Sequence, residues 1–334
     1  MAKHLFMVSL PTRRIRMSQY NAMSEREEKR VERLSRWVDY SQRTLRTSIA
    51  CEGIGIHSGR KVHLTLGPAP AGHGFVFRRL DIAGESGLVP AKWDAVVDTT
   101  LCTVLSNRHG ISIRTPEHIL AALSGAGVDN ATIEVDAPEL PIMDGSSDDF
   151  TFLIGCVGVR PQPSRPQRRI EVLRPVQVQE GDSWARLLPS DRFKVSCTID
   201  YDHPHVGVQR FDFDSEQQSF SEAVGRARTF GFLHELEWLR ARGYAKGASL
   251  DNAVAISPNG VMNDGGLRYP DELARHKVLD VIGDLALAGA PILGAFQGYR
   301  SGHRLNNMVL HALMTDESAW RWEGVETAAQ RVVA

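Results

Sequence analysis

The stretch DELARHKVLDVIGDLALAG, residues 271–289, is the part of the sequence on which the predicted fold depends. It contains no proline and is long enough for about five helical turns. On a helical wheel its polar side chains fall within one stripe of roughly 100°, which holds His276, Lys277, Asp280 and Asp284. Most of the remaining surface is apolar, which is typical of a buried helix. Ionisable groups on such a helix need partners, because burying a lone charge is costly.

The spacing of His276 and Asp280 suggests a shared partner for these two side chains. They are four residues apart, so they lie one above the other on the same helix face. This spacing suits two ligands of one metal ion, and Asp284 follows one turn further along. An ordinary pair at i and i+4 that faces water has the same spacing. The helix alone therefore does not decide between a metal site and a surface pair.

Composition narrows the class of protein. The chain has 334 residues, enough for two domains or one large one, and a formal net charge of −1 that gives no argument for a nucleic-acid partner. No apolar run approaches the roughly 20 residues that span a bilayer. Four scattered cysteines without a C-x-x-C motif indicate a reducing compartment and argue against cysteine-bound zinc. The twelve histidines are the better candidate ligands.

The order of predicted elements divides the chain. Short alternating β-like runs are followed by a helix, a strand and a second helix, and the same order returns after the proline-rich, basic segment PQPSRPQRR. We find no sequence repeat between the two halves, so a structural duplication is inferred from this order alone. We predict an α+β protein with an extension that is disordered or loosely helical (1–39), a first domain (40–160), a linker (161–169), a second domain (170–318) and a C-terminal tail (319–334).

The sequence TPEH predicts a helix start. Thr115 is expected as the N-cap, Pro116 at the first helical position and Glu117 in the first turn. If His118 binds a metal, Glu117 can lie beside a metal-bound water without being a ligand, as hydrolytic zinc sites require. The alternative is an acid that the helix dipole favours in the first turn, followed by an unrelated histidine.

His303 lies at another predicted helix start, in GYRSGHRLNN. It could act as a general acid, with Asp284 as the carboxylate that orients the ring and favours its charged form. Thr229, in RARTFGF, could donate a hydrogen bond to a developing oxyanion. A surface histidine and a structural threonine are the alternatives.

Other histidines compete for the metal. His57 lies in the sequence H-S-G, and His203 and His205 form an H-P-H motif beside Asp202. Because H-x-H is a real metal spacing, this loop could bind a metal weakly.

Taken together, these segments resemble the UDP-3-O-acyl-N-acetylglucosamine deacetylases, the zinc hydrolases of lipid A synthesis. The resemblance covers residues from about 40 to 314 and leaves the first ~40 residues outside it. Its order of motifs is far more specific than any single one. The matching pieces are EGIGIHSGRKV, DTTLCTVL, TPEHILAALSGAGVDNATIEVDAPELPIMDGSS, ARTFGF, DELARHKVLDVIGDL and GAFQGYRSGHRLNN.

The resemblance implies a role for each matching residue. The zinc ligands would be His118, His276 and Asp280. Glu117 would be the general base on the metal-bound water, His303 the general acid that protonates the leaving amine, and Asp284 the group that orients His303. Thr229 would help to polarise the acetyl carbonyl, and Lys277 would line the substrate site.

The resemblance also implies a fold and a substrate passage. Two similar layered sheet and helix domains would pack together, each with a small insert, and the active site would lie at their interface. The second insert, at about 231–256, would form a passage for the fatty acyl chain, although plain core packing would explain the same apolar residues. The expected substrate contacts are Lys277, Phe230, Phe232, Leu233, Leu236, Leu250, Ala253, Ala255 and Arg300. Arg300 stands where many members carry lysine, and arginine recognises phosphate differently.

The implied activity is removal of the N-acetyl group from UDP-3-O-acyl-N-acetylglucosamine, which gives UDP-3-O-acyl-glucosamine and acetate in the committed step of lipid A biosynthesis. We expect a cytoplasmic monomer that uses Zn2+, or Fe2+, which the same ligands accept. Its partner would be a nucleotide-sugar lipid, with transient contact to a membrane surface. Two alternatives stay open: a non-haem Fe(II) oxygenase with the same ligand set, and a lipid- or nucleotide-binding protein without activity.

Overall fold

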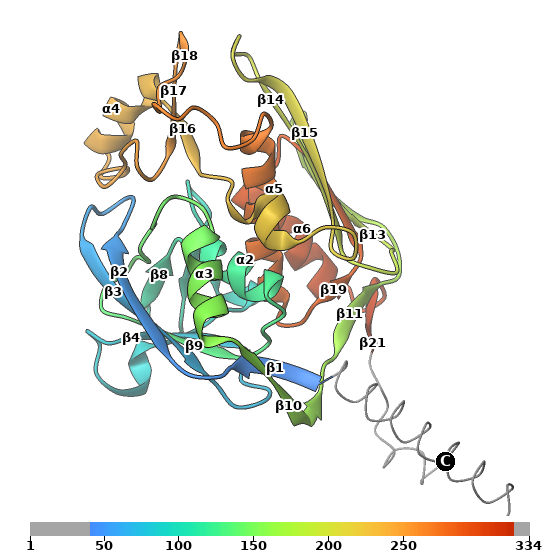
Figure 1. Cartoon of the computed structure of the whole chain (residues 1–334). Coiled ribbons are helices and arrows are strands. Elements are labelled where there is room, and N and C mark those ends of the chain that lie inside the picture. Colours follow the sequence, from blue (N-terminus) through green and yellow to red (C-terminus); the bar gives the residue numbers. More distant parts are fainter. Residues whose placement is uncertain (1–40, 324–334) are drawn as a thin grey trace, which may run out of the picture. The chain divides into compact units, whose positions relative to one another are not determined.

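The computed structural model describes residues 41–323, which belong to one compact unit (Figure 1). The predicted extension and most of the predicted C-terminal tail lie outside the described residues. Within the described part, sheets and helices form mixed layers, so the predicted α+β class is confirmed.

The first half is built on a five-stranded sheet. Its strands alternate buried and exposed residues; in β3, for example, Val62, Leu64 and Leu66 face the core. All neighbouring pairs are antiparallel except β4 and β9, which are parallel. The spatial order is β2 (Ile49–Ile54), β3 (Lys61–Pro68), β9 (Ala131–Val135), β4 (Phe75–Arg79) and β5 (Leu88–Pro90). The helices of this half are α2 (Glu117–Gly125) and α3 (Asp148–Val157).

The second half repeats this topology. Its first, second, fifth, third and fourth strands lie side by side in that order, as in the first half, and the third and fifth strands are again the parallel pair. The spatial order is β12 (Val176–Glu180), β13 (Ser183–Leu188), β20 (Ala295–Tyr299), β14 (Lys194–Tyr201) and β15 (Gly207–Asp214). The helices before and after its fifth strand are α5 (Glu272–Leu285) and α6 (His303–Thr315). The inferred duplication is therefore visible in the fold although the two sequences do not resemble each other.

Each half carries a small three-stranded sheet between the fourth strand of its large sheet and the helix that precedes the fifth strand. In the first half this sheet is β6 (Val96–Asp98), β7 (Val104–Ser106) and β8 (Ser112–Arg114). In the second half it is β16 (Phe230–Phe232), β17 (Val254–Ser257) and β18 (Gly260–Val261), joined by α4 (Leu233–Ala241). This second sheet and α4 occupy the segment in which we expect the acyl passage.

Five more strands join or border the halves. β1 (Ser41–Leu45) pairs with β10 (Val159–Pro166), so most of the predicted linker is a strand. β11 (Arg169–Val172) pairs with β19 (Ile292–Leu293) and with β21 (Trp320–Glu323), which lies in the predicted tail. The predicted domain boundaries stay predictions. Four short helical turns complete the described elements: η1 (Gly84–Gly87), η2 (Trp93–Ala95), η3 (Ser221–Gly225) and η4 (Ala286–Ala288).

The burial predicted for the helix at residues 271–289 is confirmed. The predicted helix 271–289 is α5 followed by the short turn η4, and it ends at Gly289, whose φ of 80° is left-handed. Within α5, Arg275 and Lys277 are the two residues outside the buried set. Figure 1 places α5 at the centre of the described unit, beside α2.

The start of α2 differs from the prediction. Thr115 is not the N-cap, because its φ of 59° places it in the left-handed region and its side chain caps nothing. Pro116 occupies the cap position instead, and its carbonyl accepts the N–H of Leu120 at 3.0 Å. The N–H of Thr115 donates to the carbonyl of Thr103 at 3.1 Å. This tertiary hydrogen bond, rather than a capping side chain, fixes the turn from β8 into the helix.

A glycine allows α2 and α5 to approach closely. A Cβ atom on Gly283 would lie 2.0 Å from the carbonyl oxygen of Glu117 and 2.7 Å from its carbonyl carbon. Because both of these atoms are backbone, no side-chain rotation could relieve the clash. The contact brings the first turn of α2 against the middle of α5.

We predict that Gly283→Ala lowers the free energy of unfolding by about 1–3 kcal/mol, the usual cost of overpacking a core. The matched control is Gly155→Ala in α3, where a Cβ would meet nothing within 4 Å. That change should stabilise the protein by roughly 0.5–1 kcal/mol, because alanine favours a helix. Urea unfolding of both variants tests the contact, and equal stabilities would contradict it.

Candidate active site

His118, His276 and Asp280 come together between α2 and α5. One ligand atom from each lies within 4.8 Å of the others, and all three residues are buried. Asp280 Oδ1 is 3.3 Å from His276 Nε2 and 3.7 Å from His118 Nε2. The two imidazole rings meet edge to face, with centroids 5.0 Å apart. Two nitrogens and one oxygen thus face one point from two helices that lie far apart in the sequence.

The chemistry of these three residues fits a divalent cation. Asp280 Oδ1 is buried and has no hydrogen-bond partner in the described part of the chain, although a buried carboxylate oxygen normally has one. His276 Nδ1 lies 3.0 Å from the carbonyl of Ala227, an acceptor that leaves Nε2 as the free ligand atom. Burial lowers the pKa of His276 to about 3, which keeps the ring neutral as a metal ligand must be.

Glu117 borders this group and is buried, with 2% of its surface exposed. Burial raises its pKa to about 7, against the opposing effect of the nearby His303 and His118. A carboxylate with such a pKa can take a proton at neutral pH and release it again. Glu117 Oε1 lies 3.7 Å from His303 Nε2. An acid and an imidazole therefore face each other beside the candidate metal ligands.

His303 is held by Asp284. Its Nδ1 lies 2.9 Å from Asp284 Oδ2, which also accepts a hydrogen bond from Asn306 Nδ2 at 2.9 Å. Burial alone would lower the pKa of His303, but the carboxylates of Asp284 and then Glu117 raise it to about 10. The imidazole is therefore charged at neutral pH and can donate a proton.

Lys277, Thr229 and Phe230 lie around this centre. Lys277 Nζ donates to Asp280 Oδ2 at 2.8 Å and lies 5.4 Å from the centroid of the Phe230 ring. Burial would lower the pKa of Lys277, but Asp280 raises it well above the ordinary value. The Phe230 ring meets the His276 ring at 6.3 Å. Thr229 immediately precedes Phe230, and its backbone N–H donates to the carbonyl of Gly145 at 2.7 Å.

The residues expected in the acyl passage lie on the second insert. Phe232 contacts Tyr201, with ring centroids 5.2 Å apart, while Leu233 and Leu250 are 41% and 46% exposed. The half-buried members are Leu236, Ala253 and Ala255. Arg300 is exposed, and its backbone N–H donates to the carbonyl of Thr198 at 2.8 Å. Their roles toward an acyl chain or a nucleotide stay predictions.

The competing histidines lie outside the candidate metal group. Within residues 41–323, His118, His276 and Asp280 form the one group of three with metal-binding geometry. His57 packs edge-on against Tyr244 at 5.4 Å, and burial lowers its pKa. The rings of His203 and His205 are 5.9 Å apart, and His203 Nδ1 accepts the backbone N–H of His205.

Sequence reasoning missed the residues that hold the site in place. Thr103 donates to Asp284 Oδ1 at 2.6 Å, from a segment 181 positions away in the chain. Asn306 could have been found, because it lies three residues after His303 on one helix face. A buried ion pair joins Arg228 Nε to Glu272 Oε1 at 2.8 Å. It ties the loop that contains Ala227 and Thr229 to the start of α5.

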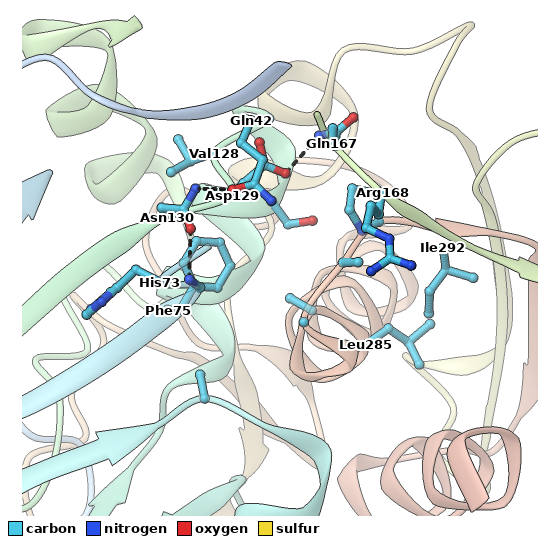
Figure 2. A pocket seen from close by; sticks show the side chains of 18 of the residues that line it. Gln42, His73, Phe75, Val128, Asp129, Asn130, Gln167, Arg168, Leu285 and Ile292 are labelled. Carbon is cyan, nitrogen blue, oxygen red and sulfur yellow. Dashed lines mark hydrogen bonds between the residues drawn. The ribbon is translucent and has the colours of Figure 1, made fainter. Parts of the chain in front are cut away.

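A separate cleft of about 510 Å³ lies at the C-terminal ends of α2 and α5. Figure 2 shows Asp129 on one side of it and Arg168, Leu285 and Ile292 on the other. Leu285 is nine residues beyond His276, roughly 14 Å along the helix axis at 1.5 Å per residue. None of the predicted site residues lines this cleft. Asp129 is the one carboxylate among the described residues that line the cleft, and both of its oxygens already accept hydrogen bonds, from Gln167 and from the N–H of Arg43.

A candidate metal centre with a carboxylate and an imidazole beside it is an arrangement typical of metal-dependent hydrolases. Residues 42–315 match the family described as UDP-3-O-acyl N-acetylglycosamine deacetylase, and the chain belongs to this family.

Similar proteins agree with this family. A UDP-3-O-acyl-N-acetylglucosamine deacetylase of Idiomarina loihiensis is 47% identical over 283 residues, which cover 84% of this chain and 92% of that protein. Relatives with the same name from Stenotrophomonas maltophilia and Xanthomonas oryzae pv. oryzae are each 46% identical. The first match covers 86% of this chain and the second 85%, and each covers 95% of the relative.

We predict that His118→Ala sharply lowers the affinity for zinc, because one of three ligands is lost. His203→Ala is the matched control, since it removes a half-buried histidine from the competing H-P-H motif and should leave zinc affinity unchanged. Competition with a chromogenic chelator measures both variants. Wild-type affinity in His118→Ala would remove this residue from the ligand set.

We also predict that Asp284→Asn lowers the pKa of His303, because the largest charge that raises it is removed. If the charged imidazole is the active form, the alkaline limit of kcat/KM should fall by roughly 1–3 pH units. Asp136→Asn is the control, because it breaks an exposed pair with His63 of similar geometry, at 2.7 Å. An unchanged alkaline limit in Asp284→Asn would contradict the assignment.

Proposed function

We propose that this protein is a zinc-dependent deacetylase that hydrolyses the N-acetyl group of UDP-3-O-acyl-N-acetylglucosamine, the committed step of lipid A biosynthesis. The observation that carries the proposal is the approach of Glu117 Oε1 and His303 Nε2 to 3.7 Å beside a buried group of two histidines and one aspartate. Family membership supplies the substrate class. The reaction yields UDP-3-O-acyl-glucosamine and acetate.

His118, His276 and Asp280 would hold the metal. Bound there, a divalent cation would act as a Lewis acid on the acetyl carbonyl and would make a water more acidic. The same two-nitrogen, one-oxygen set accepts zinc or iron. We propose zinc because three ligands of histidine and carboxylate that leave one position open for water are typical of hydrolytic zinc sites. Lys277 would neutralise the second oxygen of Asp280, to which it donates at 2.8 Å, and so would leave Oδ1 for the metal.

Glu117 would act as the general base. Its raised pKa, about 7, suits a group that accepts the proton of the attacking water near neutral pH. As the water adds to the acetyl carbon, negative charge develops on the carbonyl oxygen. Thr229 would stabilise this oxyanion by a hydrogen bond from its hydroxyl.

His303 would act as the general acid. Asp284 and Glu117 keep its ring charged, and Asp284 accepts the Nδ1 proton, so the Nε2 proton is the one available for transfer. Transfer to the sugar nitrogen releases a neutral amine in place of an unstable amide anion. The bond between nitrogen and the acetyl carbon then breaks and acetate leaves.

The remaining expected contacts would hold the substrate. We propose that Lys277 and Phe230 lie against the sugar, because both border the metal ligands. The apolar residues of β16, β17 and α4 would carry the acyl chain, and Arg300 would pair with the nucleotide phosphates. Monomeric state stays a prediction.

We propose that the reaction takes place in the cytoplasm. Four free cysteines suit a reducing compartment. None of the helices in the described residues is both long and apolar enough to cross a bilayer. Transient contact with a membrane surface would give access to the acylated substrate.

Release of acetate without oxygen is the direct test of this function. Purified protein loaded with zinc should release acetate from UDP-3-O-acyl-N-acetylglucosamine under anaerobic conditions, and a chelator should abolish the activity. A non-haem oxygenase, which shares the ligand set, would require oxygen. A binding protein would release no acetate under any condition.

We predict that Glu117→Ala retains zinc and loses turnover by roughly 10²–10⁴-fold, the usual contribution of a general base. Glu134→Ala is the matched control, because that carboxylate pairs with Arg78 on the first sheet. Its loss should leave zinc content and turnover unchanged. Metal analysis and acetate release are measured on the same preparations. Wild-type turnover by Glu117→Ala would exclude it as the base.

A further inference from the structure

Thr103 is a fully buried residue just before β7 that bonds to both carboxylates beside the metal group. Its hydroxyl donates to Asp284 Oδ1 at 2.6 Å. Its backbone N–H donates to Glu117 Oε2 at 3.3 Å. Its carbonyl accepts the N–H of Thr115 at 3.1 Å, which anchors Thr103 to the turn before α2. Thr103, in the first half, thus bonds both to Glu117, the proposed base, and to Asp284 in the second half. Asp284 in turn holds His303, the proposed acid.

The two oxygens of Asp284 have separate partners. Oδ2 accepts from His303 Nδ1 and from Asn306 Nδ2, both at 2.9 Å, while Oδ1 accepts from Thr103. A carboxylate with donors on one oxygen only can rotate about its terminal torsion, which has a broad energy well. The hydroxyl of Thr103 opposes that rotation. It therefore fixes the plane in which Asp284 presents Oδ2 to the imidazole.

Thr103 also fixes the orientation of the Glu117 carboxylate. Its Oε2 accepts the N–H of Thr103, and its Oε1 is the oxygen that lies 3.7 Å from His303 Nε2. The amide of Thr103 therefore decides which oxygen faces the reacting groups. A threonine suits this position because its β-branched side chain has few χ1 rotamers, so hydroxyl and amide keep a fixed relation.

We propose that Thr103 is a positioning residue that sets the general base Glu117 and the general acid His303 relative to each other, the latter through Asp284. This inference rests on the proposed function. In the described part of the chain, Thr103 bonds to the carboxylates of Glu117 and Asp284 and to none of the three candidate metal ligands. Its hydroxyl acts on the orientation of the imidazole and not on substrate affinity.

The first test is Thr103→Val, which keeps the shape and the backbone N–H and removes the hydroxyl. We expect kcat to fall roughly 10- to 100-fold, as for other outer partners of catalytic groups. KM and zinc affinity should stay close to their wild-type values. Thr103→Ser, which restores the donor, should recover most of kcat. The matched control is Thr44→Val, which removes another buried hydroxyl, one that donates to the carbonyl of Asn130 at 2.7 Å, and should leave kcat unchanged.

A double-mutant cycle separates positioning from general damage to the fold. If Thr103 acts through Asp284, Thr103→Val should cost little kcat in an Asp284→Asn background, because the orientation is already lost. The inference is overturned if Thr103→Val lowers kcat by the same factor in both backgrounds. It is also overturned if Thr103→Ser has a kcat as low as that of Thr103→Val. If the valine variant does not fold, Thr103→Ala takes its place in the cycle with the same expected pattern. If the wild-type protein releases no acetate, both the proposed function and this inference are overturned. If the wild type is active but the effects of the two substitutions on kcat are additive, the inference alone is overturned.

Discussion

The contact between α2 and α5 is the constraint on which the site depends. Gly283 presents no side chain at the point where a Cβ would lie 2.0 Å from the carbonyl oxygen of Glu117. The two helices can therefore meet backbone against backbone. Because His118 is the residue after Glu117, this approach also brings its ring to that of His276. A wider spacing would separate the proposed base and one ligand from the other two ligands.

The pKa values of neighbouring buried groups in the site are shifted in different directions. Glu117 has no strong donor beyond one amide, so burial dominates and raises its pKa to about 7. His303 is largely enclosed, yet the carboxylate of Asp284 outweighs this burial and holds the pKa of His303 at about 10. His276, whose Nδ1 faces a neutral carbonyl, is driven to a pKa of about 3. His303 is therefore suited to carry a proton and His276 to bind a metal, although both lie near the same aspartate, Asp280.

The sequence pattern predicted local features well and tertiary ones poorly. The burial of α5 and the pairing of His276 with Asp280 follow from helical periodicity, which is a property of neighbours in the chain. That His118 joins them came from a family resemblance, since no spacing connects residues 118 and 276. The cap at Thr115 was wrong because a hydrogen bond to Thr103 overrides local preference. Thr103 itself was not singled out, since a buried threonine in a short β-like run carries no pattern.

The repeated topology explains how one fold produces an asymmetric site. Helices α2 and α5 occupy equivalent places, each after the fourth strand and the small sheet of its half. In the first half β8 runs into α2 through a left-handed residue, so the proposed base and one ligand lie in the first helical turn. In the second half the buried pair of Arg228 and Glu272 ties the loop before β16 to the start of α5. The ligands of α5 lie further along that helix, at its fifth and ninth residues, and they face the first turn of α2. Two copies of one arrangement thus contribute unlike groups, because α2 carries its functional residues in its first turn and α5 carries them further along.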